Sequence, residues 1–134
     1  MDIEVARRRV DEARIARLGT VTPERSAHVV PCCFAVVGGV AYTAVDGKPK
    51  STLALRRIAN VVAHPQASLL VDHYQEDWSA LWWVRMDGVA RITDSPGELK
   101  TAKRALLGKY PQYEQVALPG PVIALDIRRW VAWP

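Results

Sequence analysis

The chain has 134 residues, 49% of them hydrophobic and 24% charged, which is typical of one soluble globular domain and leaves too little core for two. Lys and Arg number 18 against 14 Asp and Glu, and the resulting net charge of +4 favours anionic ligands such as nucleic acid, phosphorylated cofactors or acidic tails. No nucleic-acid-binding motif is present, and no apolar run approaches the roughly 18 residues that cross a bilayer, so we expect neither nucleic acid as a partner nor membrane insertion.

The N-terminal segment predicts a short amphipathic helix over residues 3–14. It opens on the acidic stretch Met1-Asp2-Ile3-Glu4, which lacks the features of a secretory signal, so we expect a cytoplasmic protein. Arg7 and Arg14 fall on nearly the same side of this helix because seven residues are close to two whole turns. They form either a solvated basic flank or a site for an acidic group.

Two hairpins follow. Residues 16–21 and 27–34 are rich in β-forming residues and are separated by a polar turn, and Gly38-Gly39 supplies a second tight turn before a third strand through Tyr42 and Thr43. The two cysteines, Cys32 and Cys33, are neighbours on the second strand and cannot bridge each other without strain. His28, His64 and His73 show no metal-ligand spacing, so we expect no metal site.

The middle of the chain predicts a loop, a helix and two strands. Residues 46–49 form the loop, residues 50–60 the helix, and His64-Pro65 closes it. Residues 67–71 are a short apolar run suited to a buried strand. Residues 81–92 form a long strand rich in Trp and Val, in which Gly88 predicts a bulge or bend.

The last part of the chain carries the sharpest local signal. Ser95 can cap a helix, Pro96 suits its first position and Glu98 completes a capping box, so a third helix should run to about Gly108. After Pro119-Gly120-Pro121, residues 122–127 alternate as a strand does. The sequence therefore predicts one mainly β (α+β) domain over residues 1–134, a six-stranded antiparallel barrel with about three flanking helices.

A phosphate-binding constellation stands out where the third strand leads into the second helix. Lys48 and Lys50 supply ammonium groups, Tyr42, Thr43 and Ser51 supply hydroxyls, and the helix start supplies free amides. The same lysines would also be ordinary in a solvated loop. No nucleophile-base motif or Walker-type loop is present, so if the protein is an enzyme we expect a cofactor to do the chemistry.

Several phrases, in this order, resemble the pyridoxamine-phosphate-oxidase-like split-barrel superfamily, and within it the actinobacterial branch of F(420)-dependent enzymes. The resemblance to the superfamily rests on the order of His28-Val29-Val30-Pro31-Cys32-Cys33, Tyr42-Thr43, Lys48-Pro49-Lys50, Asn60 to Pro65 and Ala67-Ser68-Leu69-Leu70-Val71. The resemblance to the branch rests on Ala16-Arg17-Leu18-Gly19-Thr20-Val21, Val29-Val30-Pro31-Cys32-Cys33-Phe34 and Asp77-Trp78 with Leu81-Trp82-Trp83-Val84-Arg85. The match covers nearly the whole chain from about Ile15 to the C-terminus.

The resemblance implies where a cofactor would bind. The ring system would lie along the second strand, at Val30, Pro31, Cys32 and Cys33, and its phosphate would meet Thr43, Lys48 and Lys50. The partner subunit of a homodimer would complete each site, with Trp82 or Trp83 as the candidate. Pyridoxamine-phosphate oxidases carry an arginine-lysine pair, where this chain has Lys-Pro-Lys, and further ligands near the C-terminus, which weakens the case for vitamin B6 oxidation.

These features favour a reductase in which a hydride passes from reduced F(420) to an electron-poor small organic acceptor. The alternatives are an FMN-dependent oxidoreductase and a non-catalytic deazaflavin or flavin carrier. His28, His73 and Tyr74 are all candidates for a proton donor, and nothing in the sequence ranks them. Arg7, Arg14 and one of Arg56 and Arg57 are candidates for holding the acidic tail of F(420).

Overall fold

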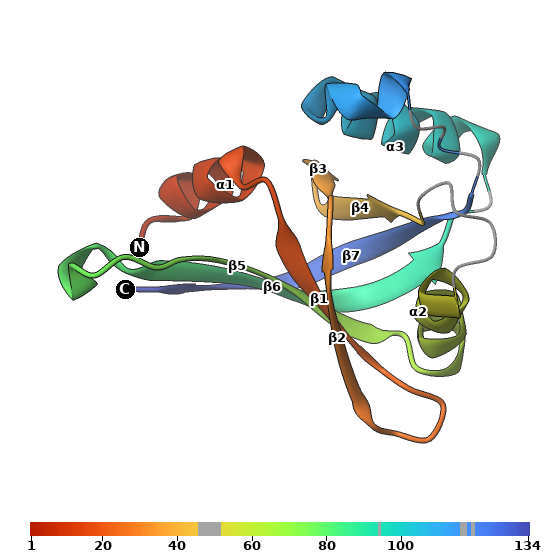
Figure 1. The fold of residues 1–134 in the computed structure, drawn as a ribbon, viewed down its shortest axis with the longest axis horizontal. Coiled ribbons are helices and arrows are strands. Elements are labelled where there is room, and N and C mark those ends of the chain that lie inside the picture. Colours follow the sequence, from red (N-terminus) through yellow and green to blue (C-terminus); the bar gives the residue numbers. More distant parts are fainter. Residues whose placement is uncertain (46–51, 94, 116–117, 119) are drawn as a thin grey trace.

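The computed structural model describes the chain except residues 46–51, 94, 116–117 and 119, and shows three α-helices flanking one curled antiparallel sheet (Figure 1). The helices are α1 (Ile3–Glu12), α2 (Thr52–Ala63) and α3 (Pro96–Lys109). The strands are β1 (Ala16–Val21), β2 (Ala27–Cys32), β3 (Ala35–Val37), β4 (Val40–Ala44), β5 (Gln66–His73), β6 (Trp82–Ile92) and β7 (Val122–Trp133). Short 3-10 helices cover Trp78–Ala80 and Pro111–Glu114.

The order of the strands explains why the sheet is curled. It runs β2-β1-β5-β6-β7-β4-β3 with antiparallel neighbours throughout, so β2 and β3 occupy opposite edges. Only Cys33 and Phe34 separate these two strands in the chain, so three residue steps join Cys32 to Ala35 and span at most about 11 Å. The two edges must therefore meet at this link, which rolls the sheet into a half-barrel.

The predicted count of six strands is too low by one. The apolar run from Val29 to Val37 has no turn signal to divide it, but the chain leaves one sheet edge at Cys33-Phe34 and joins the other. The strand predicted over residues 122–127 is also too short, because β7 continues along β6 as far as Trp133. The predicted bulge is confirmed, since the β6–β7 register shifts between Asp87 and Gly88.

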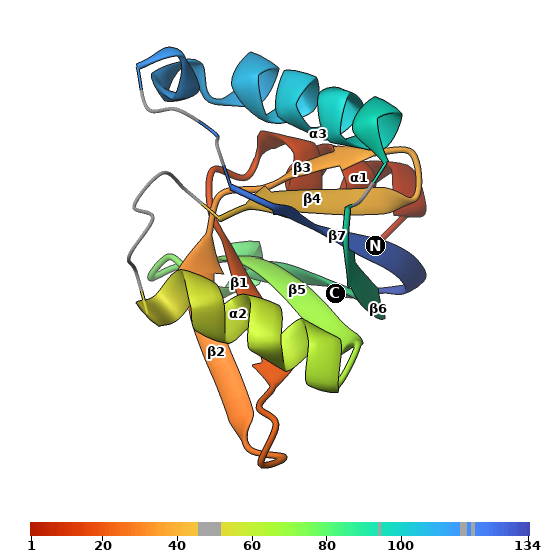
Figure 2. The same cartoon turned by 90° about the vertical axis from the view of Figure 1, so that its right-hand side faces the viewer.

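Side chains pack into two apolar layers. The inner layer fills the half-barrel and includes Leu18, Leu69 and Met86, with Val10 of α1 and Val61 of α2 packed against them. The second layer lies between α3 and the outer face of β3, β4 and β7, and is built from Leu106 and other buried residues, namely Ala35, Tyr42, Ala44, Ala102, Tyr110, Val122 and Ala124. Figure 2 shows α3 and α2 on opposite sides of the half-barrel.

The helix ends follow the local signals. The Asp2 carboxylate accepts a hydrogen bond from the Glu4 amide at 2.8 Å and starts α1, which ends at Glu12, two residues before the predicted end. The Ser95 hydroxyl accepts from the Glu98 amide at 3.2 Å and starts α3, as predicted. In the part of the chain that the structure describes, no helix has the length and hydropathy needed to cross a membrane.

Candidate functional site

Strand β2 presents its predicted site residues to different surroundings. Val30 and Cys32 point into the half-barrel and are buried, whereas Pro31 points outward and is exposed. Cys33 lies just after the strand and is half-buried beside the second apolar layer. Because β2 is an edge strand, its side away from β1 has no strand partner among the described residues, and backbone groups there are available to a ligand.

Burial determines the protonation state of the Cys32 thiol. Burial raises the pKa of this thiol, and the Thr43 hydroxyl and the Arg57 guanidinium oppose the rise only in part. Cys32 therefore stays protonated at neutral pH, as a small core side chain does. The Thr43 hydroxyl also donates to the Cys33 carbonyl at 2.8 Å, which ties β4 to the link between β2 and β3.

Tyr42 and Thr43 lie on opposite faces of β4. Tyr42 points into the second layer and donates from its hydroxyl to Glu98 at 2.9 Å. Thr43 is buried on the opposite face, where its hydroxyl meets the backbone carbonyl of Cys33. Burial, with Glu98 nearby, raises the pKa of Tyr42 to about 12. The structure thus brings Thr43 to the end of β2 and holds Tyr42 under α3.

The other predicted phosphate ligands, Lys48, Lys50 and Ser51, lie outside the described residues. The chain enters this segment from Val45, which is buried, and leaves it at Thr52, where α2 begins.

The seam between α2 and the β1–β2 hairpin contains buried polar atoms that have no hydrogen-bond partner among the described residues. They are Nδ1 of His28, Nε of Arg57 and Oδ1 of Asn60, whose Nδ2 donates to the Thr20 hydroxyl at 3.1 Å. Thr20 pairs with His28 across the hairpin, and Arg57 precedes Asn60 by three residues on the same face of α2. An unpaired buried polar group is costly, so these atoms are candidates for contact with a ligand or water.

A cavity of about 680 Å³ opens at the same seam, between the hairpin tip and α2. Its lining includes Thr22, Ser26, Arg56 and Asn60. Asn60 entered the sequence analysis only as the start of the segment 60–65 that resembles the family and was not predicted as a site residue, although its place beside the apolar Ile58 and Val61 was the available signal.

Lys109, at the end of α3, is a second residue that sequence reasoning missed. Its Nζ is covered, has no hydrogen-bond partner in the described part of the chain and lies 3.8 Å from the centroid of the Phe34 ring. Burial, with the Arg14 cation nearby, lowers the pKa of Lys109 to about 8, and the Asp11 carboxylate opposes this only in part. A poorly compensated cation thus stands beside the end of β2.

Trp82 and Trp83 point to opposite faces of β6. Trp82 packs on the inner layer, with the Arg9 guanidinium carbon 4.8 Å from its ring centroid and the His73 ring stacked at 6.0 Å. Trp83 lies on the outer face of the sheet, with Arg85 5.8 Å from its ring. Two of the candidate proton donors lie far apart in the sheet. His73 is the last residue of β5, whereas His28 is near the start of β2.

The predicted cationic tail residues are also dispersed. Arg7 lies 4.9 Å from the Trp130 ring centroid, and Arg14 lies 4.5 Å from the Tyr110 ring and donates to the Lys109 carbonyl at 2.9 Å. Arg14 and Lys109 are thus the pair that the structure brings together.

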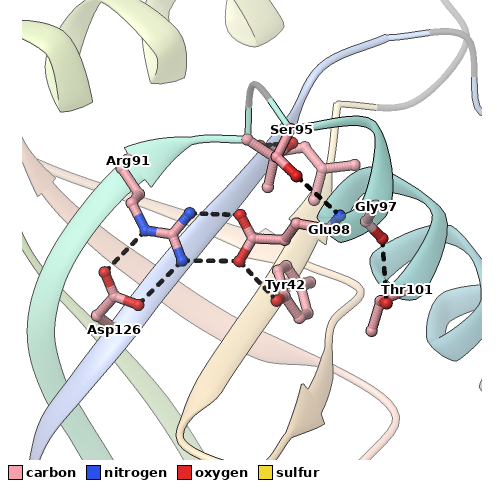
Figure 3. Close-up of polar contacts among 9 residues, drawn as sticks. Tyr42, Arg91, Ser95, Gly97, Glu98, Thr101 and Asp126 are labelled. Atoms are coloured by element: carbon pink, nitrogen blue, oxygen red, sulfur yellow. Dashed lines mark hydrogen bonds and ion pairs between the residues drawn. The ribbon is translucent and has the colours of Figure 1, made fainter.

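An ion-pair network holds α3 onto the sheet (Figure 3). Arg91 of β6 donates to Glu98 at 2.7 Å and to Asp126 of β7 at 2.8 Å, and Tyr42 donates to the same Glu98 carboxylate. The Arg91 guanidinium lowers the pKa of both carboxyl groups. The Glu98 carboxylate therefore accepts hydrogen bonds from Arg91 and Tyr42 on the sheet, rather than from the Ser95 amide as in the capping box that the sequence predicts.

The curled antiparallel sheet, with helices packed against it on opposite sides, defines the class of split-barrel proteins. The family model for pyridoxamine 5'-phosphate oxidase matches residues 3–134, so the chain belongs to this family. The match confirms the family expected from the sequence, but it does not separate deazaflavin from flavin. No curated protein matches the chain.

Solved structures share the fold at low identity. A conserved hypothetical protein from Mycobacterium tuberculosis is similar with a TM-score of 0.78 and 22% identity, over 99% of this chain and 84% of that one. An FAD binding protein from Mycobacterium smegmatis gives 0.70 and 16%, over 99% and 94%. The heme storage protein HutZ from Vibrio cholerae gives 0.73 and 16%, over 98% and 92%.

Proposed function

We propose that this protein is a homodimeric oxidoreductase that binds F(420) along β2. When bound and reduced, F(420) would supply a hydride to an electron-poor small organic acceptor. The observation that carries the proposal is a pair of covered cationic nitrogens, Arg57 Nε and Lys109 Nζ, on either side of the end of β2; neither has a hydrogen-bond partner among the described residues. Buried charges of this kind are normally paired, so they point to an anionic ligand.

The surroundings of β2 fit a planar ring with a polar edge. Pro31 and Val29, which is 66% exposed, offer an apolar outward surface, and the free edge of the strand offers backbone donors and acceptors. Cys32 and Val30 support the strand from the core side. These residues would position the ring without taking part in proton or hydride transfer.

The phosphate of the cofactor is assigned to the junction between β4 and α2. Thr43 stands at the end of β4, and Lys48, Lys50 and Ser51 follow before α2 begins. Charge-assisted contacts from two ammonium groups suit a phosphodiester. This part of the proposal rests on the sequence and on the family resemblance.

The second copy would pack against the outer face of β5, β6 and β7. Leu70, Trp83 and Val131 lie half-buried on this face of the described chain, and Trp133 beside them is 46% exposed. Apolar side chains on an open sheet face favour a partner surface. In such a dimer, Trp83 of one subunit would complete the site of the other.

F(420) is favoured over FMN because its glutamate tail adds negative charges beyond the phosphate that both carry. Arg57, Lys109 and the neighbouring Arg14, together with the net charge of +4, provide more positive charge than a single phosphate needs. The alternatives are an FMN-dependent oxidoreductase and a cofactor carrier, since the solved structures of the same fold include an FAD binding protein and a heme storage protein.

Parallel titrations with F(420), FMN and hemin at low and high salt test the proposal. We expect F(420) to bind most tightly, with an affinity that falls more steeply with salt than that of FMN. Arg57→Gln should weaken F(420) binding, whereas Arg8→Gln, which removes an exposed charge from α1, should not. If FMN binds more tightly at both salt concentrations, the flavin alternative replaces the proposal.

Turnover separates an enzyme from a carrier. Oxidation of reduced F(420) should be followed with a panel of electron-poor quinones, enones and nitroaromatics. Binding without turnover of any acceptor would favour the carrier.

A further inference from the structure

A groove runs along the outer side of α3, away from the half-barrel and from the site on β2. Its volume is about 690 Å³, which lies within the range of pockets that hold small molecules. The floor and walls are mainly apolar, made by Leu99 and Leu107 of α3, with Pro96 at one end and Tyr113 and Leu118 on the facing side. Leu107 is 40% exposed, so part of this surface meets solvent.

The apolar side chains of α3 form a continuous stripe. Leu99 and Leu107 lie eight residues apart and therefore on one side of the helix, and Lys103 stands between them with its aliphatic stem on the same side. From Pro96 to Leu107 the helix rises about 16 Å, at roughly 1.5 Å per residue. The groove is therefore long enough for an extended alkyl chain rather than for a single compact group.

Cations line the groove beside this stripe. Lys100, Lys103 and Arg104 all contribute to the lining, and no Asp or Glu does so among the described residues. None of the ion pairs and hydrogen bonds found in the described part of the chain engages these three side chains. The groove therefore combines an apolar channel with positive charge that no described residue neutralises.

We propose that the α3 groove binds a fatty carboxylate, with its alkyl chain along Leu99 and Leu107 and its headgroup among Lys100, Lys103 and Arg104. Burying the alkyl chain removes its methylenes from water, which favours binding. The guanidinium of Arg104 can hold a carboxylate with two hydrogen bonds, and the stems of the lysines cover the chain.

The same observations disfavour two other occupants. An acidic peptide would leave the leucine stripe without an apolar partner. A second copy of the chain would bring the same three cations together across a two-fold axis, because the same patch meets itself in such an interface. A fatty carboxylate matches both the charge and the apolar surface, and its binding is independent of the cofactor proposed for β2.

Isothermal titration of the purified full-length protein with dodecanoate, kept below its micelle concentration, tests the inference. We expect one site, with no binding of acetate or of a glutamate oligopeptide, and at least tenfold weaker binding of dodecyltrimethylammonium. Leu107→Asp should weaken dodecanoate at least tenfold, whereas Val62→Asp, on the exposed side of α2 at 73% exposure, should not.

A second pair of variants tests the charges without touching the apolar stripe. Lys100→Gln/Lys103→Gln should weaken dodecanoate at least tenfold, and Arg8→Gln/Arg128→Gln, which removes the same net charge from exposed positions elsewhere, should not. Circular dichroism should show that every variant is folded. F(420) affinity should be unchanged in the α3 variants, which separates failure here from failure of the proposed function.

Four results would overturn the inference: no binding of dodecanoate, binding that neither pair of variants distinguishes, equal binding of the cationic amphiphile or the glutamate oligopeptide, or tighter binding of dodecyl phosphate. Light scattering provides the last check. If Leu107→Asp turned a dimer into a monomer, the groove would be an interface between copies and not a ligand site.

Discussion

Replacing Lys109 by Met should stabilise the protein at neutral pH. The pKa of this lysine falls from 10.5 to about 8 on folding, mainly because its amine is buried. At neutral pH the folded state carries the full cost of keeping the amine charged, and the shift alone corresponds to about 3 kcal/mol. Because the side chain is half-buried, solvent screening and the contact with Phe34 reduce the net effect to about 1 to 2 kcal/mol.

The sign of the pH dependence follows from the direction of the shift. Between about pH 8 and 10.5 the unfolded chain holds the Lys109 proton more firmly than the folded chain does, so this contribution to stability rises with pH. The advantage of Lys109→Met should therefore shrink across that range and vanish above it.

Urea unfolding of the wild type and of Lys109→Met at several pH values gives the difference between their free energies of unfolding. Groups that titrate alike in both proteins drop out of this difference. Lys100→Met, on the exposed side of the same helix, is the control and should change little. A difference that stays constant with pH, or a variant that is less stable at pH 7, would refute the reasoning.

Three further predictions concern stability and assembly. Gly88→Ala should lose about 1 to 3 kcal/mol in urea unfolding, because an added Cβ would lie 2.9 Å from the carbonyl carbon of Asp126, while Gly108→Ala, with open space around it, should be neutral or stabilising. Arg91→Gln should lower the free energy of unfolding at about pH 7, because Arg91 holds the carboxyl pKa of Glu98 and Asp126 low. The free energy of unfolding should then fall less steeply in the variant than in the wild type as the pH is lowered into the acid range. An equally steep fall in both proteins would contradict this. Light scattering should report a dimer at micromolar concentration, and a single 14.9 kDa species would disprove it.

Local signals in the sequence predicted most of the elements because short-range chemistry decides them. Ser95 and Pro96 start α3 as expected, and Gly38 adopts the positive φ of 60° that the second hairpin needs. Gly88 marks the bulge because the backbone of Asp126 leaves no room for a side chain there. Each of these depends on a few neighbouring residues or on the steric needs of one position.

Elements that depend on distant partners were predicted less well. The end of β7 at Trp133 is set by pairing with β6, and the break between β2 and β3 is set by the meeting of the two sheet edges. Tyr42 and Thr43 were also both predicted as phosphate ligands, but neighbouring residues on β4 point to opposite faces, so only one of them lies in the second layer.

The sequence by itself determined the family, the element types and the excess of positive charge. Only the tertiary structure decided which charges lack partners, because pairing depends on side chains that are far apart in the chain. Arg91, three residues beyond Gly88 on β6, is satisfied by Glu98 and Asp126, whereas the Nζ of Lys109 is covered by Phe34 and finds no acceptor among the described residues. Burial makes that difference costly, and it is this cost that separates a structural ion pair from a candidate ligand site.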